Sequence, residues 1–448
     1  MPARLSALAF LALLALVRPL GADTGPAPQP DRTLSPLLVA TNLWYGDPAD
    51  EVWRQVSDAR VRLIRIGGHA YDKNVPSHAT LTAWVKKIRA HGAEPVIQVS
   101  QYQSPEKAAD LVRLFNRRRA AGEPVKIWNI GNEPWLQNGR KAPETVAAEV
   151  VAYWKPIAAA MKAVDPTIKL YGFDEAYYIK PAYEALFGGE HDITGRVPGK
   201  NYYYCDGLSW HRYPQTTNEP GLAEIEDFHT SMKKIRDLLD RANARHGRRG
   251  DDALQWGLGE FNAKGGKQVH TFGTGQMFAA VYGLSARYGA TYVASWSMFE
   301  SGGNRGPTDF GAFDGKAFTP RPSYWHQRLF AETMAGVTVA DARSDNRELL
   351  VFATHDKKSN RTGLVLLNLS DAAATCDIRF ASGGAAPRGT LVSVPLKKQA
   401  AHLDKLEPRS SLFLVFEKNR VKRTAYSAED FAASRAPVAT SLSFPNAP

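Results

Sequence analysis

Cysteine is scarce in this chain of 448 residues, which contains only Cys205 and Cys376. At most one intramolecular disulfide is therefore available, and the sequence leaves open whether the two thiols pair after export or stay free and buried. No Cys/His spacing typical of a zinc site is present, and no glycine-rich loop fits a phosphate-binding motif. We therefore predict no metal and no cofactor.

The first 22 residues differ from the rest of the chain. Arg4 precedes the apolar stretch Leu5–Val17, and the small residues Gly21 and Ala22 follow, as in a secretory signal peptide. The apolar stretch is too short to span a bilayer comfortably, which disfavours a retained anchor. We predict a signal peptide at 1–22, no stable membrane anchor, and a secreted or periplasmic location.

Acidic residues are outnumbered, since 56 lysines and arginines against 45 aspartates and glutamates give a formal net charge of +11. A basic surface concentrates anionic partners, so nucleic acid and an acidic polysaccharide are both candidates. Positive charge gathers in Arg113–Arg119, Lys233–Arg249 and Lys418–Arg423. The first two segments alternate with apolar residues at helical spacing, which favours solvated helix faces. No nucleic-acid-binding motif is present, so we predict no nucleic-acid partner.

Short apolar runs alternate with amphipathic stretches between residues 37 and 336. The predicted strands are Leu37–Trp44, Leu63–Ile66, Pro95–Val99, Val125–Ile130, Ile168–Phe173, Gly207–Trp210, Trp256–Gly259 and Tyr292–Trp296. The predicted helices between them include Leu81–His91, Glu106–Ala121, Val146–Val164, Ile225–Arg245 and Gly275–Tyr288. This alternation predicts an α/β fold of the (β/α)8 type, a TIM barrel. A doubly wound sheet also alternates, but here polar residues follow many different strands, which favours a ring of βα loops.

The sequence pattern changes at about residue 337. Short β-rich runs separated by turn residues follow, namely Leu349–Ala353, Gly363–Leu369, Thr375–Phe380, Gly389–Val394 and Ser411–Phe416. They predict a small β-sandwich at 337–420. Residues 23–36 are predicted to be a linker, or to add a strand to the sandwich through Asp31–Pro36. Residues 421–448 have little periodicity and are predicted to be a tail, with mobility as one interpretation.

Two glutamates, Glu133 and Glu260, each follow a short apolar run, in Lys126–Pro134 (KIWNIGNEP) and Gln255–Asn262 (QWGLGEFN). Glycoside hydrolysis needs such a pair, because one carboxyl group protonates the leaving oxygen while the other attacks or stabilises the anomeric carbon. Since they follow predicted strands four and seven, both should lie at the catalytic face of the barrel. A separation of about 5 Å would imply retention through a covalent intermediate.

Each glutamate alone is weak evidence, because Asn-Glu-Pro also starts helices and Glu260 would fit a surface strand end. Their joint position at two strand ends favours catalysis. Asn132 is placed to bond the sugar 2-hydroxyl. His211, at the end of strand six, is predicted to line the subsite, and Tyr213 is predicted to hydrogen-bond the nucleophile and keep it ionised.

Two further residues are predicted to belong to the site. Arg65 lies in predicted strand two, where a buried guanidinium needs a carboxylate partner, and we predict that it orients Glu260. Trp296 ends strand eight, and its flat apolar face suits the C–H surface of a sugar ring, with core packing as the alternative.

Together these residues resemble the clan A retaining glycoside hydrolases, most closely family 79, the heparanase and β-glucuronidase group. The resemblance covers about residues 38–336 and rests on Asn42–Leu43, Leu63–Gly68, Gly131–Pro134, Trp210–Tyr213, Leu258–Glu260, Gly283–Arg287 and Pro322–Trp325. Arg-x-Gly-Gly and Gly-Leu-Ser-Ala-Arg are its more specific elements. The resemblance implies that Glu133 is the acid/base and Glu260 the nucleophile of a double displacement at a β-glycosidic bond.

The sequence departs from the heparanase branch where substrate is recognised. Ala40 replaces Asp, His69 replaces Thr, and Ser301–Arg305 is Ser-Gly-Gly-Asn-Arg where that branch has Gly-x-Gly-Asn-Tyr. We predict that His69 and Arg305 contact substrate and that Arg305 replaces the tyrosine contact to a uronate, because a guanidinium pairs well with a carboxylate. The alternative is that Arg305 is a surface loop residue and the sugar is neutral.

The predicted substrate is a uronic-acid-containing polysaccharide, such as a heparan-sulfate-like chain or a β-glucuronide. A β-xylosidase or exopolysaccharide hydrolase of the family 39 type, acting on a neutral sugar, is the nearest alternative. A non-catalytic carbohydrate-binding barrel is an alternative of another class, although the presence of both glutamates argues against it. The glycan, the endo or exo mode and the oligomeric state stay open.

Overall fold

The computed structural model describes residues 32–43, 48–300, 309–314, 317–334, 338–340, 342–344, 346–380, 391–394, 400–417 and 420–443. The predicted signal peptide at 1–22 and the predicted uronate ligand Arg305 lie outside these residues. No helix within them is long and apolar enough to cross a membrane.

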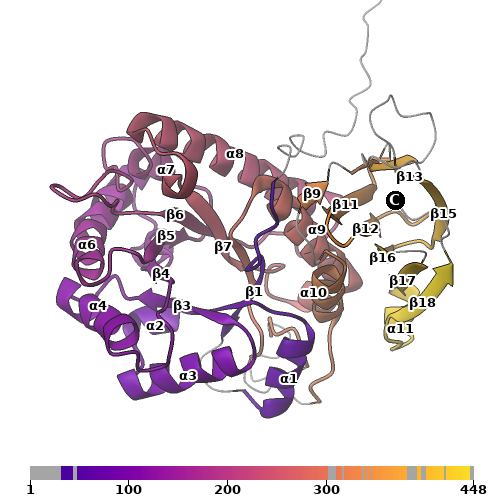
Figure 1. Ribbon diagram of the computed structural model, residues 1–448, viewed down its shortest axis with the longest axis horizontal. Helices are drawn as coiled ribbons and strands as arrows, with labels where there is room; N and C mark the ends of the chain where they lie inside the picture. The colour runs from indigo at the N-terminus through magenta and orange to yellow at the C-terminus, as the bar shows by residue number, and fades with distance from the viewer. Residues whose placement is uncertain are drawn as a thin grey trace, which may run out of the picture.

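The first domain is a closed barrel of eight parallel strands that pair in sequence order, with β8 beside β1 (Figure 1). The strands are β1 (Val39–Leu43), β2 (Leu63–Ile66), β3 (Glu94–Val99), β4 (Ile127–Ile130), β5 (Lys169–Glu175), β6 (Gly207–Arg212), β7 (Gln255–Phe261) and β8 (Tyr292–Ser295). Each overlaps a predicted strand, so the TIM-barrel prediction is confirmed.

The barrel interior is apolar at one end and polar at the other. The apolar cluster consists of Ala40, Leu63, Val96, Ile127, Tyr171, Tyr292 and Ala294. Because side chains alternate along a strand, the residue two positions later also points inward. On the first four strands these later residues are polar and buried, namely Asn42, Arg65, Gln98 and Asn129. The polar layer thus lies toward the carboxyl ends of the strands, where TIM-barrel active sites occur.

Helices surround the barrel (Figure 1). They are α1 (Asp50–Asp58), α2 (His69–Lys73), α3 (His78–Ala90), α4 (Pro105–Val112), α5 (Pro134–Gln137), α6 (Pro143–Val164), α7 (Lys180–Leu186), α8 (Leu222–His246), α9 (Phe272–Tyr288) and α10 (Pro322–Thr333). The side chains of Ser77, Ser104 and Thr271 accept backbone N–H groups at the starts of α3, α4 and α9. Gly247 ends α8 in the left-handed conformation that favours glycine.

The second domain is a β-sandwich, as predicted. One sheet has the order β18-β17-β16-β12-β11-β9 and the other β10-β14-β13-β15. Its first strands are β9 (Thr338–Ala340), β10 (Arg343–Ser344), β11 (Leu349–Asp356), β12 (Arg361–Asn368), β13 (Ala374–Phe380), β14 (Leu391–Val394), β15 (Ala400–Leu406) and β16 (Ser410–Glu417). Thr33 forms an isolated bridge with Thr338, so the N-terminal segment contacts the edge of this domain.

Residues 421–443, which belong to the segment predicted to be a tail (421–448), instead complete the larger sheet. β17 (Arg420–Ser427) pairs with β16, β18 (Val438–Ser443) pairs with β17, and α11 (Ala428–Ala432) lies between them. Every residue of β18 is exposed, so this edge strand has no buried face and no apolar alternation that could reveal it in sequence.

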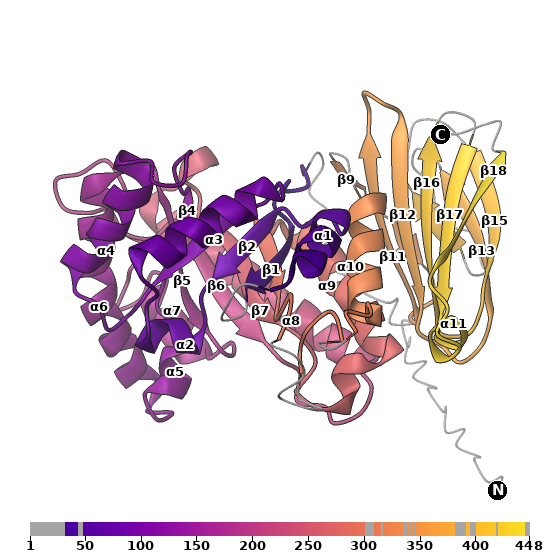
Figure 2. The ribbon, with the colours of Figure 1, turned by 90° about the horizontal axis from the view of Figure 1, so that it is seen from below.

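Helix α9 lies at the junction of the two domains (Figure 2). All of its residues are buried. Arg287 donates hydrogen bonds to the carbonyl oxygens of Ala342 and Val351 in the sandwich. A Cβ on Gly283 would lie 2.3 Å from the Phe352 ring, so only glycine fits this close approach. The Gly-Leu-Ser-Ala-Arg element therefore belongs to the domain junction.

The two cysteines lie in different hydrophobic cores and are not joined. Cys205 packs in the barrel core and Cys376 in the sandwich core. Burial raises the pKa of the Cys205 thiol to about 12, so this thiol is protonated and unreactive at neutral pH.

Candidate active site

Glu133 and Glu260 face each other at the carboxyl ends of β4 and β7. A carboxylate oxygen of Glu133 lies within 4.8 Å of one of Glu260. Carboxyl groups about 5 Å apart are typical of retaining glycosidases, whereas inverting enzymes keep a wider gap to hold a water molecule. The geometry therefore suits direct attack by a carboxylate on carbon.

The backbone aims Glu133 at the site through an uncommon conformation. Its φ of 45° and ψ of 54° are left-handed, which non-glycine residues adopt only where the surroundings impose it. The Glu133 amide donates to the carbonyl oxygen of Asp174 at 2.8 Å, and Pro134 begins α5 immediately afterwards. The resulting turn leaves the Glu133 side chain 17% exposed, while that of Glu260 is 7% exposed.

Glu260 accepts a hydrogen bond on each carboxylate oxygen. Arg65 Nη1 donates to Oε1 and the Tyr213 hydroxyl donates to Oε2, both at 2.9 Å, so both predicted contacts are present. Burial raises the pKa of Glu260, while the charges of His211 and Arg65 and the Tyr213 bond act to lower it. These groups orient the carboxylate and favour its ionised form.

Arg65 is fully buried beneath the glutamates. Its two terminal nitrogens donate, at 2.8–3.2 Å, to oxygens of Asn42, Gln98, Asn132, Asp174 and Glu260. Burial alone would lower the pKa of Arg65, but the carboxylates of Asp174 and Glu260 raise it above its usual value. Arg65 is thus a fixed positive charge next to Glu260.

His211 does not line the substrate cavity, contrary to the prediction. Alternation along β6 turns its ring into the barrel, where it is fully buried. Nδ1 lies 2.9 Å from Glu133 Oε1 and 3.6 Å from Glu260 Oε2, and Nε2 lies 3.6 Å from Asp174 Oδ1. Burial would lower the pKa of His211, but these three carboxylates raise it to about 10. His211 is therefore a cation that donates to Glu133 at neutral pH.

Asp174 was not among the predicted site residues, although it pairs with both buried cations. Its Oδ2 accepts from Arg65 at 3.2 Å. Burial would raise the pKa of Asp174, but Arg65 and His211 lower it below its usual value. An acidic pair, Asp174 and Glu175, directly follows the predicted strand Ile168–Phe173, and that signal could have identified it.

Glu175 is the second acidic residue that the prediction missed. It is fully buried and accepts the backbone amides of Trp135 and Ala176 at 2.9 and 2.7 Å. Burial raises the pKa of Glu175 to about 7, with the charge of Glu133 contributing and the two amide bonds opposing. Glu175 therefore holds the segment that follows Glu133 and changes charge near neutral pH.

A cavity of about 400 Å³ opens beside the two glutamates. Its described lining is Gly67, His69, Ala70, Tyr71, Asn132, Glu133, Leu136, Ala176, Tyr177, Tyr213, Glu260, Lys264, Gly265, Trp296 and Phe310. The predicted substrate contacts Asn132, His69 and Trp296 thus reach the cavity. Asn132 accepts from Arg65 through Oδ1, which leaves its amide nitrogen to donate to a sugar hydroxyl.

Trp296 both packs and faces the cavity. Gly68 lies against its ring, where a Cβ would be 2.8 Å away, and the φ of +107° at Gly68 also favours glycine. This contact gives the second glycine of the Arg-x-Gly-Gly element a physical reason. Trp296 as a whole is half-buried and lines the cavity, where the accessible part of its ring suits stacking on a sugar.

Glu133, His211 and Glu260 have donor atoms close enough to share a metal ion. The set fits a metal poorly, because Arg65 and Tyr213 already donate to the two oxygens of Glu260. A divalent cation would also lie close to the fixed charge of Arg65 and be repelled. The cluster is better suited to acid–base and nucleophilic chemistry.

No protein-family model matches this sequence, and a search of curated proteins gives no match. Among solved structures, the chain is similar to an alpha-L-arabinofuranosidase from Thermotoga maritima, with 14% identity over 86% of this chain and 96% of that chain and a TM-score of 0.62. AbfB, a family 51 alpha-L-arabinofuranosidase from Bifidobacterium longum, has 15% sequence identity over 88% of this chain and 98% of that chain, with a TM-score of 0.63. CelM2, a bifunctional glucanase-xylanase from a metagenome library, has 12% sequence identity over 86% of this chain and 97% of that chain, with a TM-score of 0.62. These likenesses establish a shared fold over most of the chain.

Replacing Tyr213 with phenylalanine is expected to lower kcat about 10- to 100-fold, the usual worth of a hydrogen bond to a charged group. The Tyr213 bond lowers the pKa of Glu260, so its loss raises that pKa and shifts the acidic limb of the pH–rate profile to higher pH. Tyr177→Phe, which changes another tyrosine of the cavity lining, is the matched control. An unshifted acidic limb in the Tyr213 variant would contradict the view that the Tyr213 hydrogen bond lowers the pKa of Glu260.

Proposed function

We propose that this protein is a clan A retaining glycoside hydrolase, with Glu133 as acid/base and Glu260 as nucleophile. The observation that carries the proposal is the pair of carboxyl groups within 4.8 Å at the ends of β4 and β7. The shared fold with solved structures named as glycosidases supports it.

The proposed reaction has two displacement steps. Glu260 attacks the anomeric carbon while the proton of Glu133 passes to the glycosidic oxygen, so the C–O bond breaks and a glycosyl ester forms on Glu260. Glu133 then takes a proton from water, whose oxygen displaces Glu260 and regenerates its carboxylate. Arg65 and Tyr213 stabilise Glu260 as it leaves with a negative charge. Two inversions give net retention.

We further propose that the substrate is a β-linked, uronic-acid-containing polysaccharide or a β-glucuronide, cleaved outside the cytoplasm. Lys264 supports an acidic sugar, because it lines the cavity and no carboxylate among the described residues pairs with its ammonium group. The net charge of +11 and the resemblance to family 79 point the same way.

Lys264→Met, which removes the charge but keeps the chain length, is expected to lower kcat/KM for an aryl β-glucuronide about 10- to 100-fold. Neutral aryl glycosides should be nearly unaffected, because they have no carboxylate for Lys264 to bind. Arg305→Ala should show the same selectivity if Arg305 contacts the uronate. Lys267→Met, a nearby exposed lysine outside the cavity lining, is the matched control. Equal losses on acidic and neutral substrates would refute an acidic-sugar site.

A glycosidase for a neutral sugar, like those of family 39, is the second candidate. It is favoured by the cavity lining, whose described residues include one lysine and no arginine beside several apolar and aromatic side chains. A binding protein without turnover is disfavoured, because carboxylate oxygens of Glu133 and Glu260 lie within 4.8 Å of each other, a spacing that binding alone does not need.

Matched chromogenic β-glucuronide, β-xyloside, β-glucoside and α-L-arabinofuranoside, together with heparan sulfate, test the proposal, with Glu260→Gln as the inactive control. Cleavage of uronides or heparan sulfate alone is the expected result. Cleavage of a neutral glycoside alone would overturn the acidic substrate and keep the mechanism. Products of inverted anomeric configuration, followed by NMR, would overturn the retaining mechanism.

A further inference from the structure

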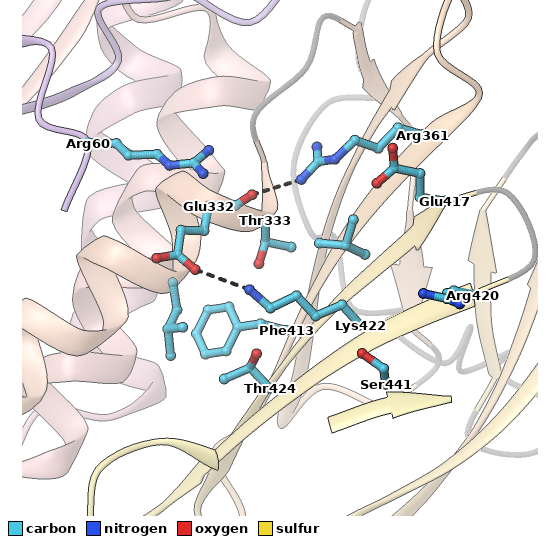
Figure 3. A pocket seen from close by; sticks show the side chains of 12 residues that line it. Arg60, Glu332, Thr333, Arg361, Phe413, Glu417, Arg420, Lys422, Thr424 and Ser441 are labelled. Atoms are coloured by element: carbon cyan, nitrogen blue, oxygen red, sulfur yellow. Dashed lines mark hydrogen bonds and ion pairs between the residues drawn. The ribbon is translucent and has the colours of Figure 1, made fainter. Parts of the chain in front are cut away.

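A second and larger cavity lies between the sandwich and the barrel (Figure 3). Its volume is about 900 Å³. Its described lining is Arg60, Leu329, Glu332, Thr333, Arg361, Phe413, Val415, Glu417, Arg420, Lys422, Thr424 and Ser441. Basic side chains outnumber acidic ones two to one in this lining, which we name the basic groove.

The floor of the basic groove is one face of the larger sandwich sheet. Phe413, Val415 and Glu417 alternate along β16, and Lys422 and Arg420 of β17 lie opposite Val415 and Glu417. Because every second side chain projects to the same side of a sheet, these residues share a face. Figure 3 shows this face opposite the end of α10. Phe413 is buried, so the accessible floor places the half-buried Val415 beside the cations Arg420 and Lys422.

Two of the four cations have no carboxylate partner among the described residues, whereas Lys422 Nζ lies 3.6 Å from a carboxylate oxygen of Glu332. Arg60 and Arg420 are exposed, and no carboxylate among the described residues pairs with either side chain. Arg361 donates to the carbonyl oxygen of Glu332 at 2.8 Å, and burial lowers the pKa of Arg361, with the charge of Glu417 opposing this shift and that of Arg60 adding to it. Four cations against two carboxylates leave an excess of positive charge in the described lining of the basic groove, which a bound anion would offset.

The basic groove lies away from the catalytic face. Arg60 follows α1 and precedes the start of β2, and Thr333 is the last residue of α10. Helices of a TIM barrel run opposite to its strands, so both residues lie at the amino ends of the strands. Glu133 and Glu260 lie at the carboxyl ends. A ligand in the basic groove is therefore not bound at the reacting bond.

We propose that the basic groove binds a linear polysaccharide that carries carboxylate or sulfate groups. Its sugar rings would pack on the half-buried Val415, and its anionic groups would pair with Arg60 and Arg420 and compete with Glu332 for Lys422. The choice of a polysaccharide rests on the proposed function. Binding at this second site tethers the polymer and raises the local concentration of cleavable bonds at the catalytic face.

The test is calorimetric titration of a size-defined heparin oligosaccharide into Glu260→Gln protein, in which the ligand is not cleaved. Two bound oligosaccharides per protein are expected, and Arg60→Gln/Arg420→Gln should remove one or weaken it at least about tenfold. The matched control, Lys107→Gln/Arg118→Gln, removes two exposed cations from the barrel surface and should keep both. Hydrolysis of a chromogenic glycoside should be unchanged by either double substitution in the active enzyme.

Unchanged stoichiometry and affinity in Arg60→Gln/Arg420→Gln would overturn the basic groove as a site. An equal loss in the control pair would show a general charge effect and overturn it too. Duplex DNA that competes for the lost site as tightly as heparin would identify a nucleic-acid surface instead. Because the titration needs no turnover, the proposal about the groove and the proposed hydrolytic function fail independently.

Discussion

Glu260→Ala is expected to lower kcat/KM at least about 10⁴-fold on every glycoside that the protein cleaves, because loss of a covalent nucleophile removes the first displacement. The shortened side chain leaves space beside the anomeric carbon, and added azide should enter it and restore turnover of an activated aryl glycoside. A single displacement by azide inverts the carbon, so the glycosyl azide should have the anomeric configuration opposite to the substrate.

Glu133→Ala should give a different pattern, because it removes only the proton donor and base. A substrate with a good leaving group needs no proton, so the rate constant of its first displacement should change little. For an unactivated disaccharide, the same rate constant should fall about 10²- to 10⁴-fold. Azide should again restore turnover, but by attacking the glycosyl ester on Glu260, so the glycosyl azide keeps the configuration of the substrate. NMR of the two azide products distinguishes the roles.

Glu149→Gln is the control for both variants, since this carboxylate bonds Asn138 and Lys141 outside the cavity. Its kinetics should match those of the unmodified enzyme. Azide products of the same configuration from the Glu133 and Glu260 variants would contradict the assignment, and products of exchanged configuration would reverse the two roles.

The sequence was sufficient to predict the barrel and the catalytic pair because both leave local patterns. Each barrel strand is a buried apolar run, and its inward residues become polar toward the carboxyl end. Arg65 was identifiable for the same reason, since a guanidinium inside such a run must have a carboxylate partner. Its pairing with Glu260 is present at 2.9 Å.

Features that depend on side-chain direction or on exposed edges were not predictable. His211 was placed at the correct strand end, but only the register of β6 shows that its ring points into the barrel. Lys264 follows Glu260 in a loop without periodicity, so its position in the cavity lining needed the structure. β18 was missed because all of its residues are exposed. The contacts of His211 and the surroundings of Lys264 join segments that are distant in sequence, whereas β18 pairs with the nearby β17 and lacks an apolar pattern.

Arg65→Met is expected to destabilise the fold by about 3–5 kcal/mol, the usual cost of removing one partner from a buried ion pair. The substitution keeps the apolar stem but leaves the carboxylates of Asp174 and Glu260 buried without their main cation. Activity should also fall steeply, because Glu260 loses one of its two donors. Chemical denaturation of the variant at two pH values measures the stability change.

The loss of folding stability in Arg65→Met should depend on pH in a definite direction. In the unmodified protein the pKa of Asp174 lies below its usual value, so its pairing stabilises the fold above the unfolded-state pKa and is lost as the pH falls. Without Arg65, burial raises the pKa of Asp174 and Glu260. At about pH 8 these carboxylates are then charged with only His211 to compensate them, and at about pH 5 they are more protonated, so the destabilisation should be larger at the higher pH.

Arg248→Met separates this electrostatic effect from the general cost of losing a buried arginine. Arg248 is also buried, but it donates to the carbonyl oxygens of Thr194, Cys205 and Asp252 and to no carboxylate. Removing it costs hydrogen bonds whose strength does not change with pH. Its destabilisation should therefore be similar at the two pH values. If Arg65→Met shows the same flat dependence, the positive charge of Arg65 is not what keeps Asp174 and Glu260 ionised.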